Sequence, residues 1–251
     1  AVGLFNNPSI PDIPGQDTFK GSQFHSARWD HSVELDGKTI ASIGSGASAI
    51  QYVPELAKIS KQLNVFQRTP QHIFAKGDRA NAQQDQSTTL WQKLSHRRER
   101  LQLFTRFEKN SRRRSSEELT QKSAEAFEKY IHSLVDDAEM LKKVLPDYPP
   151  GCKRGLRSDD WYPALLKTNV NLIDAPIDTI TETGIRTKDG EHHDVDAIIY
   201  GTGFTPTAFL TPMQITGANG QDLNHTWRDG AEAYLGISVS GFPNFFMMYG
   251  P

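Results

Sequence analysis

The sequence is poor in the features that mark secreted, membrane-spanning and nucleic-acid-binding proteins. Its 251 residues contain a single cysteine, Cys152, which excludes an internal disulfide and favours a reducing, cytoplasmic location. No apolar run approaches the roughly 20 residues that a membrane-spanning helix needs. With 28 basic and 30 acidic side chains, the chain has no excess of positive charge for binding nucleic acid. A chain of this length and charge is expected to bury a sizeable core.

Both ends of the sequence lack the polar, loosely ordered residues that are typical of natural termini. The sequence opens with "AVGLFNNPSIPDIPG" and stops after the apolar stretch "FFMMYGP". We therefore expect an internal fragment of a longer protein. Residues 6–18 are rich in proline and asparagine, which predicts an extended connector because proline restricts the backbone and removes a hydrogen-bond donor.

Residues 38–68 predict one βαβ unit. "KTIASIG" is a short β-branched run that ends in glycine, "ASAIQYVPELAKI" has the apolar spacing of a helix, and "QLNVFQR" is a second strand. A strand, a glycine turn, a helix and a strand in this order begin a parallel sheet. We therefore predict an α/β fold with a Rossmann-like domain.

The turn inside this unit has the pattern of a dinucleotide site. "GSGASA" places Gly44 at the tight turn, Gly46 where backbone approaches a pyrophosphate, and Ser48 at the start of the helix. The second strand ends in Arg68 and Thr69, where an NAD site would carry an acidic residue. A guanidinium and a hydroxyl suit a 2′-phosphate, so the pattern favours NADPH.

The remaining sequence divides into a helical insertion and a return to strands. Residues 77–150 are rich in charge and poor in β-branched residues, which predicts helices, and we interpret their basic run as a solvated helix face. From residue 169 onward short strands resume, with a hairpin about Asp189–Gly190 and an apolar strand at 197–200. His192 and His193 lie beside this hairpin without a further ligand at a useful spacing, so we expect no metal site.

One twelve-residue stretch fits neither a helical face nor strand alternation. "FKGSQFHSARWD" contains Phe19, Gly21, His25, Trp29 and Asp30, and it resembles the F-x-G-x-x-x-H-x-x-x-W-(P/D) signature of the Baeyer–Villiger monooxygenases. These flavoproteins are related to the flavin-containing monooxygenases, whose signature ends in Tyr or Phe instead of Trp. The resemblance implies that this stretch is a hinge between an FAD domain and an NADPH domain.

Further segments resemble the same family in the same order along almost the whole chain. "GSGASA" and "QRTP" resemble its NADPH site, and "PGCKR" resembles the segment with the active-site arginine, which implies that Arg154 is catalytic and that Lys153 contacts the NADPH phosphate. "YGTGF" resembles a strand end that contacts FAD, which implies cofactor-binding roles for Gly201, Thr202 and Gly203. Gly201 stands where the family usually has alanine.

The resemblance implies an FAD- and NADPH-dependent enzyme that uses O2 to convert a small ketone to an ester or lactone through a peroxyflavin. It also implies that the chain has three parts. Residues 1–30 contain the end of the FAD domain, the linker and the signature, and residues 31–195 form the NADPH domain with the helical insertion at 77–150. Residues 196–251 are the return segment of the FAD domain. The first FAD-binding unit and an active-site carboxylate are expected upstream, so we expect this chain alone not to retain FAD.

Two other functions stay open from the sequence. A flavin-containing monooxygenase that oxidises nitrogen or sulfur shares most of these motifs, and only Trp29-Asp30 and Arg154 favour the ketone reaction. A non-catalytic nucleotide-binding fragment is the other alternative. Products formed from a ketone and from a thioether separate the first two functions, and flavin absorbance of the chain tests the third.

Overall fold

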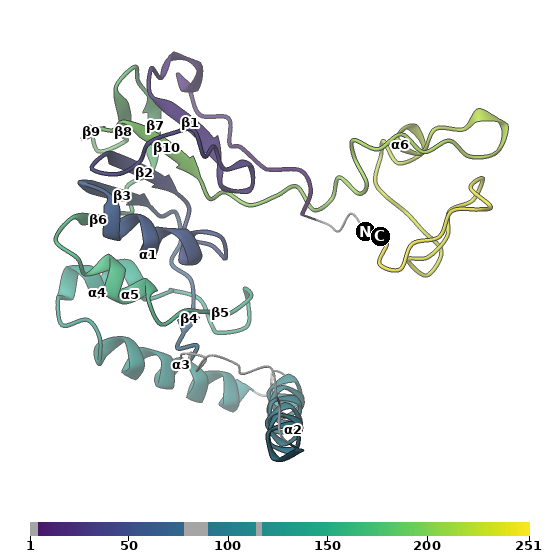
Figure 1. Cartoon of the computed structure of the whole chain (residues 1–251), viewed down its shortest axis with the longest axis horizontal. Helices are drawn as coiled ribbons and strands as arrows, with labels where there is room; N and C mark the ends of the chain where they lie inside the picture. Colours follow the sequence, from purple (N-terminus) through teal and green to yellow (C-terminus); the bar gives the residue numbers. More distant parts are fainter. Residues whose placement is uncertain (1–4, 78–89, 114–116) are drawn as a thin grey trace.

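A computed structural model describes residues 5–77, 90–113 and 117–251. Five parallel strands form its central sheet in the order β1-β10-β2-β3-β6 (Figure 1). The strands are short and contain mostly apolar side chains, because both faces of the sheet are covered. Their bounds are Ser22–His25 (β1), Thr39–Ile43 (β2), Gln62–Phe66 (β3), Val170–Ile173 (β6) and Ala197–Tyr200 (β10).

Helices cover one face of this sheet. Helix α1 (Ala49–Ile59) connects β2 to β3, as the sequence predicts, and packs beside α5 (Trp161–Leu165). Ile40 and Ile199 point from the sheet into this helical layer, where they meet Val53 and Trp161 in one buried cluster. Alternate strand residues therefore pack against helices, as the two-residue period of a strand requires.

A second, antiparallel sheet covers the opposite face. Its strands are β7 (Ile177–Ile180), β8 (Gly184–Thr187) and β9 (His192–Asp194), and β8 and β9 form the hairpin expected about Gly190. Ala41 and Ile198 alternate with the residues that face the helices and pack here with Ile185. The unit that is expected to bind NADPH thus consists of a helical layer, a parallel sheet and a small antiparallel sheet.

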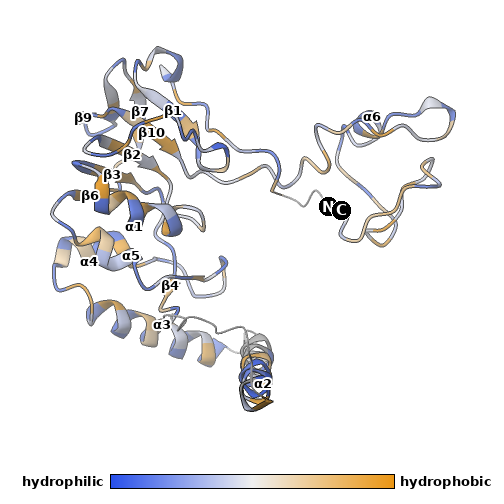
Figure 2. Cartoon of the chain, in the orientation of Figure 1, coloured by the Kyte–Doolittle hydropathy of each residue, from blue (hydrophilic) through white to orange (hydrophobic). Residues whose placement is uncertain are grey.

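The region expected to be a helical insertion contains three helices among its described residues, namely α2 (Leu90–Arg113), α3 (Glu117–His132) and α4 (Ala138–Val144). Phe127 and Ile131 bury one face of α3 in the core, as their spacing predicts. The described side chains of α2 are exposed, including Leu94 and Phe104, and much of its surface is hydrophilic (Figure 2). No helix in the described ranges is long and apolar enough to cross a membrane.

Short elements complete the chain. The two-residue strands β4 (Ile73–Phe74) and β5 (Leu156–Arg157) pair with each other at the two ends of the insertion. After Gly201 the chain leaves the sheet and forms only η3 (Ala218–Gly220) and α6 (Leu223–Thr226), well apart from the central sheet (Figure 1). Two further short 3-10 helices, η1 (Gln16–Thr18) and η2 (Ser26–Arg28), lie near the N-terminus.

The structure corrects one expectation about the signature stretch. Its middle part forms a strand, β1, which pairs in parallel with β10 at the edge of the sheet. The expected boundaries between the three parts stay a proposal, and the sheet refines where we draw them. Because β1 and β10 belong to the same sheet as β2, we propose to group residues 22–25 and 197–200 with the unit that is expected to bind NADPH, and to begin the return segment after Tyr200.

Candidate functional site

The parallel sheet gathers the predicted site residues at one edge. The strands β1, β2, β3 and β10 end at His25, Ile43, Phe66 and Tyr200, and a residue that the sequence analysis selected follows each end directly or after a few residues. Because parallel strands have their carboxyl ends at the same edge, the glycine turn, the "QRTP" segment and "YGTGF" all begin there. This edge is where open α/β sheets bind their ligands.

The turn after β2 has the geometry of a phosphate cradle. Gly44 has φ +111°, and a side chain there would lie 2.5 Å from the carbonyl oxygen of Gly201. A Cβ at Gly46 would meet nothing within 4 Å, so the backbone of this turn is open to an approaching group. Ser48 begins α1 without a hydrogen bond from its side chain to the helix, and the N–H groups of Ile50 and Gln51 donate to the carbonyls of Gly46 and Ser48. The positive end of the α1 dipole still lies at this turn and favours an anion. The turn therefore fits the pyrophosphate of a dinucleotide.

The first half of the signature packs against the sheet. Phe19 is 8% exposed and lies in the core beneath the antiparallel sheet. A side chain at Gly21 would collide with the carbonyl of Asp196 and with the ring of Phe19. Glycine is therefore required at this position for space, a reason that the sequence did not indicate.

The histidine of the signature lies at the end of β1 and is buried. Its Nδ1 accepts a hydrogen bond from the N–H of Ala27 at 3.1 Å, and its ring contacts Phe204 edge-on with centroids 5.6 Å apart. Burial lowers the pKa of His25, against the opposing effect of the nearby Gly203 carbonyl. No described residue accepts a hydrogen bond of good geometry from Nε2. His25 thus joins the signature to "YGTGF".

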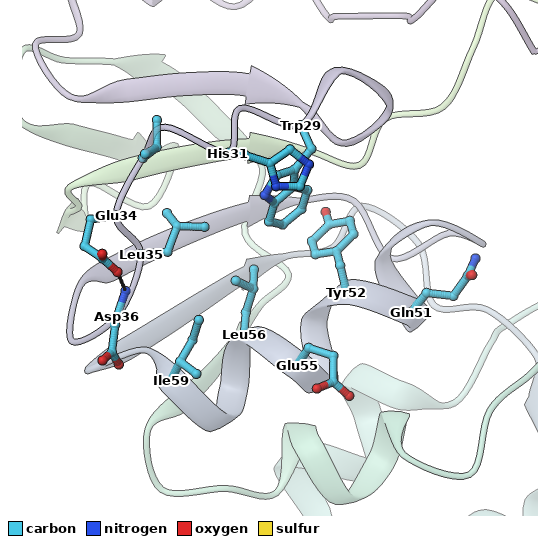
Figure 3. A pocket seen from close by; sticks show the side chains of 11 residues that line it. Trp29, His31, Glu34, Leu35, Asp36, Gln51, Tyr52, Glu55, Leu56 and Ile59 are labelled. Carbon is cyan, nitrogen blue, oxygen red and sulfur yellow. Dashed lines mark hydrogen bonds between the residues drawn. The ribbon is translucent and has the colours of Figure 1, made fainter.

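The signature tryptophan contacts a residue that sequence analysis missed. The ring of Trp29 packs against Tyr52 of α1 with centroids 5.7 Å apart (Figure 3), and the Tyr52 hydroxyl bonds Ser42 of β2 at 2.8 Å. Burial raises the pKa of Tyr52 to about 12, so its hydroxyl stays protonated. A Cβ at Gly201 would lie closer than 3.0 Å to that hydroxyl. Trp29, Tyr52 and Gly201 therefore form one packed junction, and Asp30 beside it is exposed and bonded to Ser32.

Two open grooves meet at this junction. The smaller, of about 300 Å³, lies over the start of α1 and is lined by Ser48, Gln51 and Phe204 as well as by Trp29 and Tyr52. The larger, of about 550 Å³, is lined by the same two rings and extends along α1 toward Ile59 (Figure 3). The smaller groove adjoins the glycine turn and is the one positioned to hold part of a bound dinucleotide.

The predicted basic residues lie on exposed segments near the end of β3. Arg68 is exposed and Thr69 is half-buried, with its carbonyl accepting from Ser45 Oγ at 3.4 Å. Lys153 and Arg154 are exposed on the loop that leads into β5. The pairing of β5 with β4 brings this loop toward the segment after "QRTP". Lys153 and Arg154 are not among the residues that line the two grooves.

The "YGTGF" segment is bound to the N-terminal connector. The Thr202 hydroxyl donates to the carbonyl of Ser9, and the N–H of Ser9 donates to the carbonyl of Gly203 at 2.9 Å. Gly203 has φ +83°, and a Cβ there would meet nothing within 4 Å. Two segments from opposite ends of the sequence thus run together where the chain leaves the sheet. Of residues 1–30, the first of the three expected parts, the structure describes 5–30.

The histidine pair near the hairpin has ordinary structural partners. His192 Nε2 bonds the Thr181 hydroxyl at 2.8 Å, and the ring of His193 packs edge-on against Phe66 with centroids 5.5 Å apart. Within the described ranges, His, Cys, Asp and Glu side chains form no group of three that could hold a metal ion.

Comparison with known sequences gives consistent matches. The family model described as flavin-binding monooxygenase-like matches residues 1–215. A Baeyer–Villiger monooxygenase from Pseudomonas aeruginosa is 38% identical over all of this chain, which spans 48% of that relative. One from Streptomyces coelicolor is also 38% identical, with 49% of its length spanned. The chain therefore spans about half the length of the curated relatives it matches.

Solved structures give the same picture for the fold. The structure of OTEMO in complex with FAD and NADP matches the whole chain with a TM-score of 0.79 at 29% identity, and the chain covers 56% of it. A cyclohexanone monooxygenase from Rhodococcus sp. Phi1 bound to NADP+ matches with a TM-score of 0.81 at 26% identity and 54% coverage. Another cyclohexanone monooxygenase structure, 25% identical, contains ε-caprolactone.

Proposed function

This chain belongs to the flavin-binding monooxygenase-like family, and from that premise we propose that it is part of a Baeyer–Villiger monooxygenase. The enzyme would use FAD, NADPH and O2 to convert a small ketone to an ester or lactone. The observation that carries the proposal is the junction at which the signature Trp29 packs on Tyr52 beside the glycine turn and Gly201. It joins the family signature to both predicted cofactor segments.

The strand-end edge supports NADPH as the reductant. The open backbone at Gly46, at the N-terminal end of α1, suits the pyrophosphate. Arg68 and Thr69 follow β3, the strand that pairs with β2, which precedes this turn. A guanidinium and a hydroxyl at this place can bind the 2′-phosphate. Lys153 supplies a second positive charge from the neighbouring loop. We propose these residues as the cofactor-binding set, together with Gly44 and Ser48.

The return segment supports an FAD site shared with residues outside this chain. Gly203 presents open backbone, and Thr202 and Gly201 lie where the connector and the sheet meet. When bound, the flavin supplies the activation of O2 that side chains cannot perform. We propose that the exposed guanidinium of Arg154 stabilises negative charge that develops on the substrate, because a permanently charged, planar group provides fixed electrostatic stabilisation.

We propose that the signature is the hinge between the two cofactor units. Phe19 anchors it in the core, and Trp29 contacts α1 through a ring that lines both grooves. His25 lies between the end of β1 and Phe204, so a shift of the return segment would change its surroundings. Asp30 completes the signature by bonding the turn at Ser32.

Product analysis tests the proposed reaction. The whole, FAD-loaded enzyme is supplied with NADPH, O2 and either a cyclic ketone or a thioether, and the products are identified by mass spectrometry. We expect lactone from the ketone, formed in proportion to NADPH consumed. Sulfoxide without lactone would instead support a flavin-containing monooxygenase. NADP+ binding with neither product would support a nucleotide-binding role without catalysis.

Small-molecule partners and a cytoplasmic location complete the proposal. The ketone and O2 are its substrates, and the nearly balanced charge argues against a nucleic-acid partner. Cys152 is free and exposed, which suits a reducing compartment.

A further inference from the structure

The basic segment "PGCKR" is attached to the end of β3 through one aromatic side chain. Tyr148 lies just ahead of this segment, and its hydroxyl donates a hydrogen bond of 2.8 Å to the carbonyl of Pro70. Pro70 directly follows Arg68 and Thr69, the proposed 2′-phosphate ligands. The hydroxyl of Tyr148 therefore ties the loop of Lys153 to the segment that carries Arg68.

The ring of Tyr148 also holds Lys153. The Lys153 Nζ lies over the ring, 4.4 Å from its centroid, which is within the range of a cation–π contact. The edge of the ring packs against buried His72, with centroids 5.1 Å apart, and His72 packs on Phe127 of α3. The Tyr148 ring that supports the exposed Lys153 ammonium is therefore packed against the core.

We propose that Tyr148 is a positioning residue that sets the preference for NADPH over NADH by holding Lys153 beside the 2′-phosphate site. This inference rests on the proposed function, since it concerns the choice between NADPH and NADH at the proposed cofactor site. A free lysine loses considerable side-chain entropy when it binds one phosphate. An ammonium already resting on an aromatic face loses less, and its outward N–H groups stay available for the phosphate.

The two contacts of Tyr148 can be removed separately. Tyr148→Phe removes the bond to Pro70 and keeps the aromatic face, whereas Tyr148→Leu removes both. Because the loop then loses one of its attachments, Tyr148→Phe should weaken binding of a 2′-phosphate by about threefold. Tyr148→Leu should weaken it by about five- to tenfold, since a cation–π contact is lost as well.

The experiment measures affinity by calorimetry in the whole, FAD-loaded enzyme, with 2′,5′-ADP and 5′-AMP as probes that differ only in the 2′-phosphate. We expect both Tyr148 variants to lose affinity for 2′,5′-ADP and to keep their affinity for 5′-AMP. In steady-state assays the KM for NADPH should rise while the KM for NADH stays constant. These readouts do not depend on whether the product is a lactone or a sulfoxide.

Two further variants separate positioning from a general loss of structure. Tyr130→Leu removes a half-buried tyrosine ring from the same helical layer, where it contacts Tyr162, and should leave the ratio of the two affinities unchanged. Lys153→Ala should lower 2′,5′-ADP affinity by at least as much as Tyr148→Leu, and adding Tyr148→Leu to it should have no further effect. Equal losses for both probes, or full additivity with Lys153→Ala, would overturn the proposal.

Discussion

The packed junction and the basic edge lie at the same end of the sheet, yet they are constructed by different means. At the packed junction, formed by Trp29, Tyr52 and Gly201, side chains from distant segments touch, Tyr52 bonds Ser42, and one carbon added at Gly201 would have no room. At the basic edge, formed by Arg68, Lys153 and Arg154, exposed charges stand on loops. At the packed junction, the space available decides which side chains fit. At the basic edge, the charge of a side chain and its position decide which residues can function. A substitution should therefore affect stability in the first region and binding or turnover in the second.

The largest expected effect is on turnover at the basic edge. Arg154→Ala in the whole enzyme should lower ester formation by about 10²–10³-fold, because fixed electrostatic stabilisation of developing charge is lost. NADPH oxidation should continue and hydrogen peroxide should rise, since hydride transfer depends mainly on how NADPH is held. Arg154→Lys should recover little, because an ammonium on a flexible stem does not reproduce the planar donors. The assay follows NADPH, ester and peroxide together.

The matched control is another exposed arginine nearby. Arg157 lies at the end of β5 and donates to the carbonyl of Ala75 at 3.0 Å. Arg157→Ala should leave ester formation close to wild type. Near-normal ester formation in Arg154→Ala would show that another residue carries the active-site charge.

The next effect concerns the cofactor. Arg68→Asp should weaken NADPH binding by about 10–100-fold, because it removes a hydrogen bond to a charged group and adds repulsion, a loss of roughly 1.5–3 kcal/mol. NADH binding should change little. Fluorescence titration with both cofactors measures the difference, and Arg186→Asp on β8, whose native side chain faces Asp178, serves as the control. Equal weakening for the two cofactors would assign Arg68 a structural role.

The packed junction should respond in stability. Gly201→Ala places a methyl group against the Tyr52 hydroxyl, and overpacking of this kind costs about 1–3 kcal/mol. Tyr52→Phe removes that hydroxyl, so the double variant should be more stable than Gly201→Ala alone. Denaturant unfolding of the three variants measures the recovery. A double variant no more stable than Gly201→Ala would show that the strain lies elsewhere.

A second glycine at the same edge sharpens the contrast. Gly46→Ala meets no neighbour within 4 Å, so its stability should stay close to wild type. The added methyl group would instead occupy the space through which a phosphate approaches, and NADP+ affinity should fall. Two glycine-to-alanine changes at one strand-end edge would then separate the two kinds of requirement.

The sequence predicts the sheet better than it predicts the junction. The βαβ unit and the strand at 197–200 follow from short apolar runs bounded by glycine, and all of these elements are present. Strand β1 was missed because four residues hold too little alternation, and they form a strand only through pairing with β10. Tyr52 was assigned simply to a helix, because its contact with Gly201 depends on β10 lying next to β2.

The basic edge presents the opposite case. Arg68 follows from local spacing after the glycine turn, whereas Lys153 and Arg154 were selected through family resemblance alone. Their loop approaches the end of β3 because Tyr148 bonds Pro70 and because β5 pairs with β4 across the whole insertion. Such contacts between distant segments leave no periodic signal in the sequence, and the structure is needed to find them.

The smallest expected effect concerns pH and tests the aromatic support beneath the basic edge. Burial among Phe127, Phe74 and Tyr148 lowers the pKa of His72 below its ordinary value of 6.5. The unfolded chain therefore takes up a proton at a pH where the folded chain does not, and stability falls as the pH drops below about 6.5. His72→Phe should flatten this fall between about pH 6.5 and pH 5.5, above the range in which ordinary carboxyl groups titrate. The control variant His225→Gln changes an exposed histidine and should leave the fall in stability as it is in the wild type. Unfolding midpoints measured across this window test the assignment, and an unchanged slope in His72→Phe would mean that another group, such as buried His25, carries the dependence.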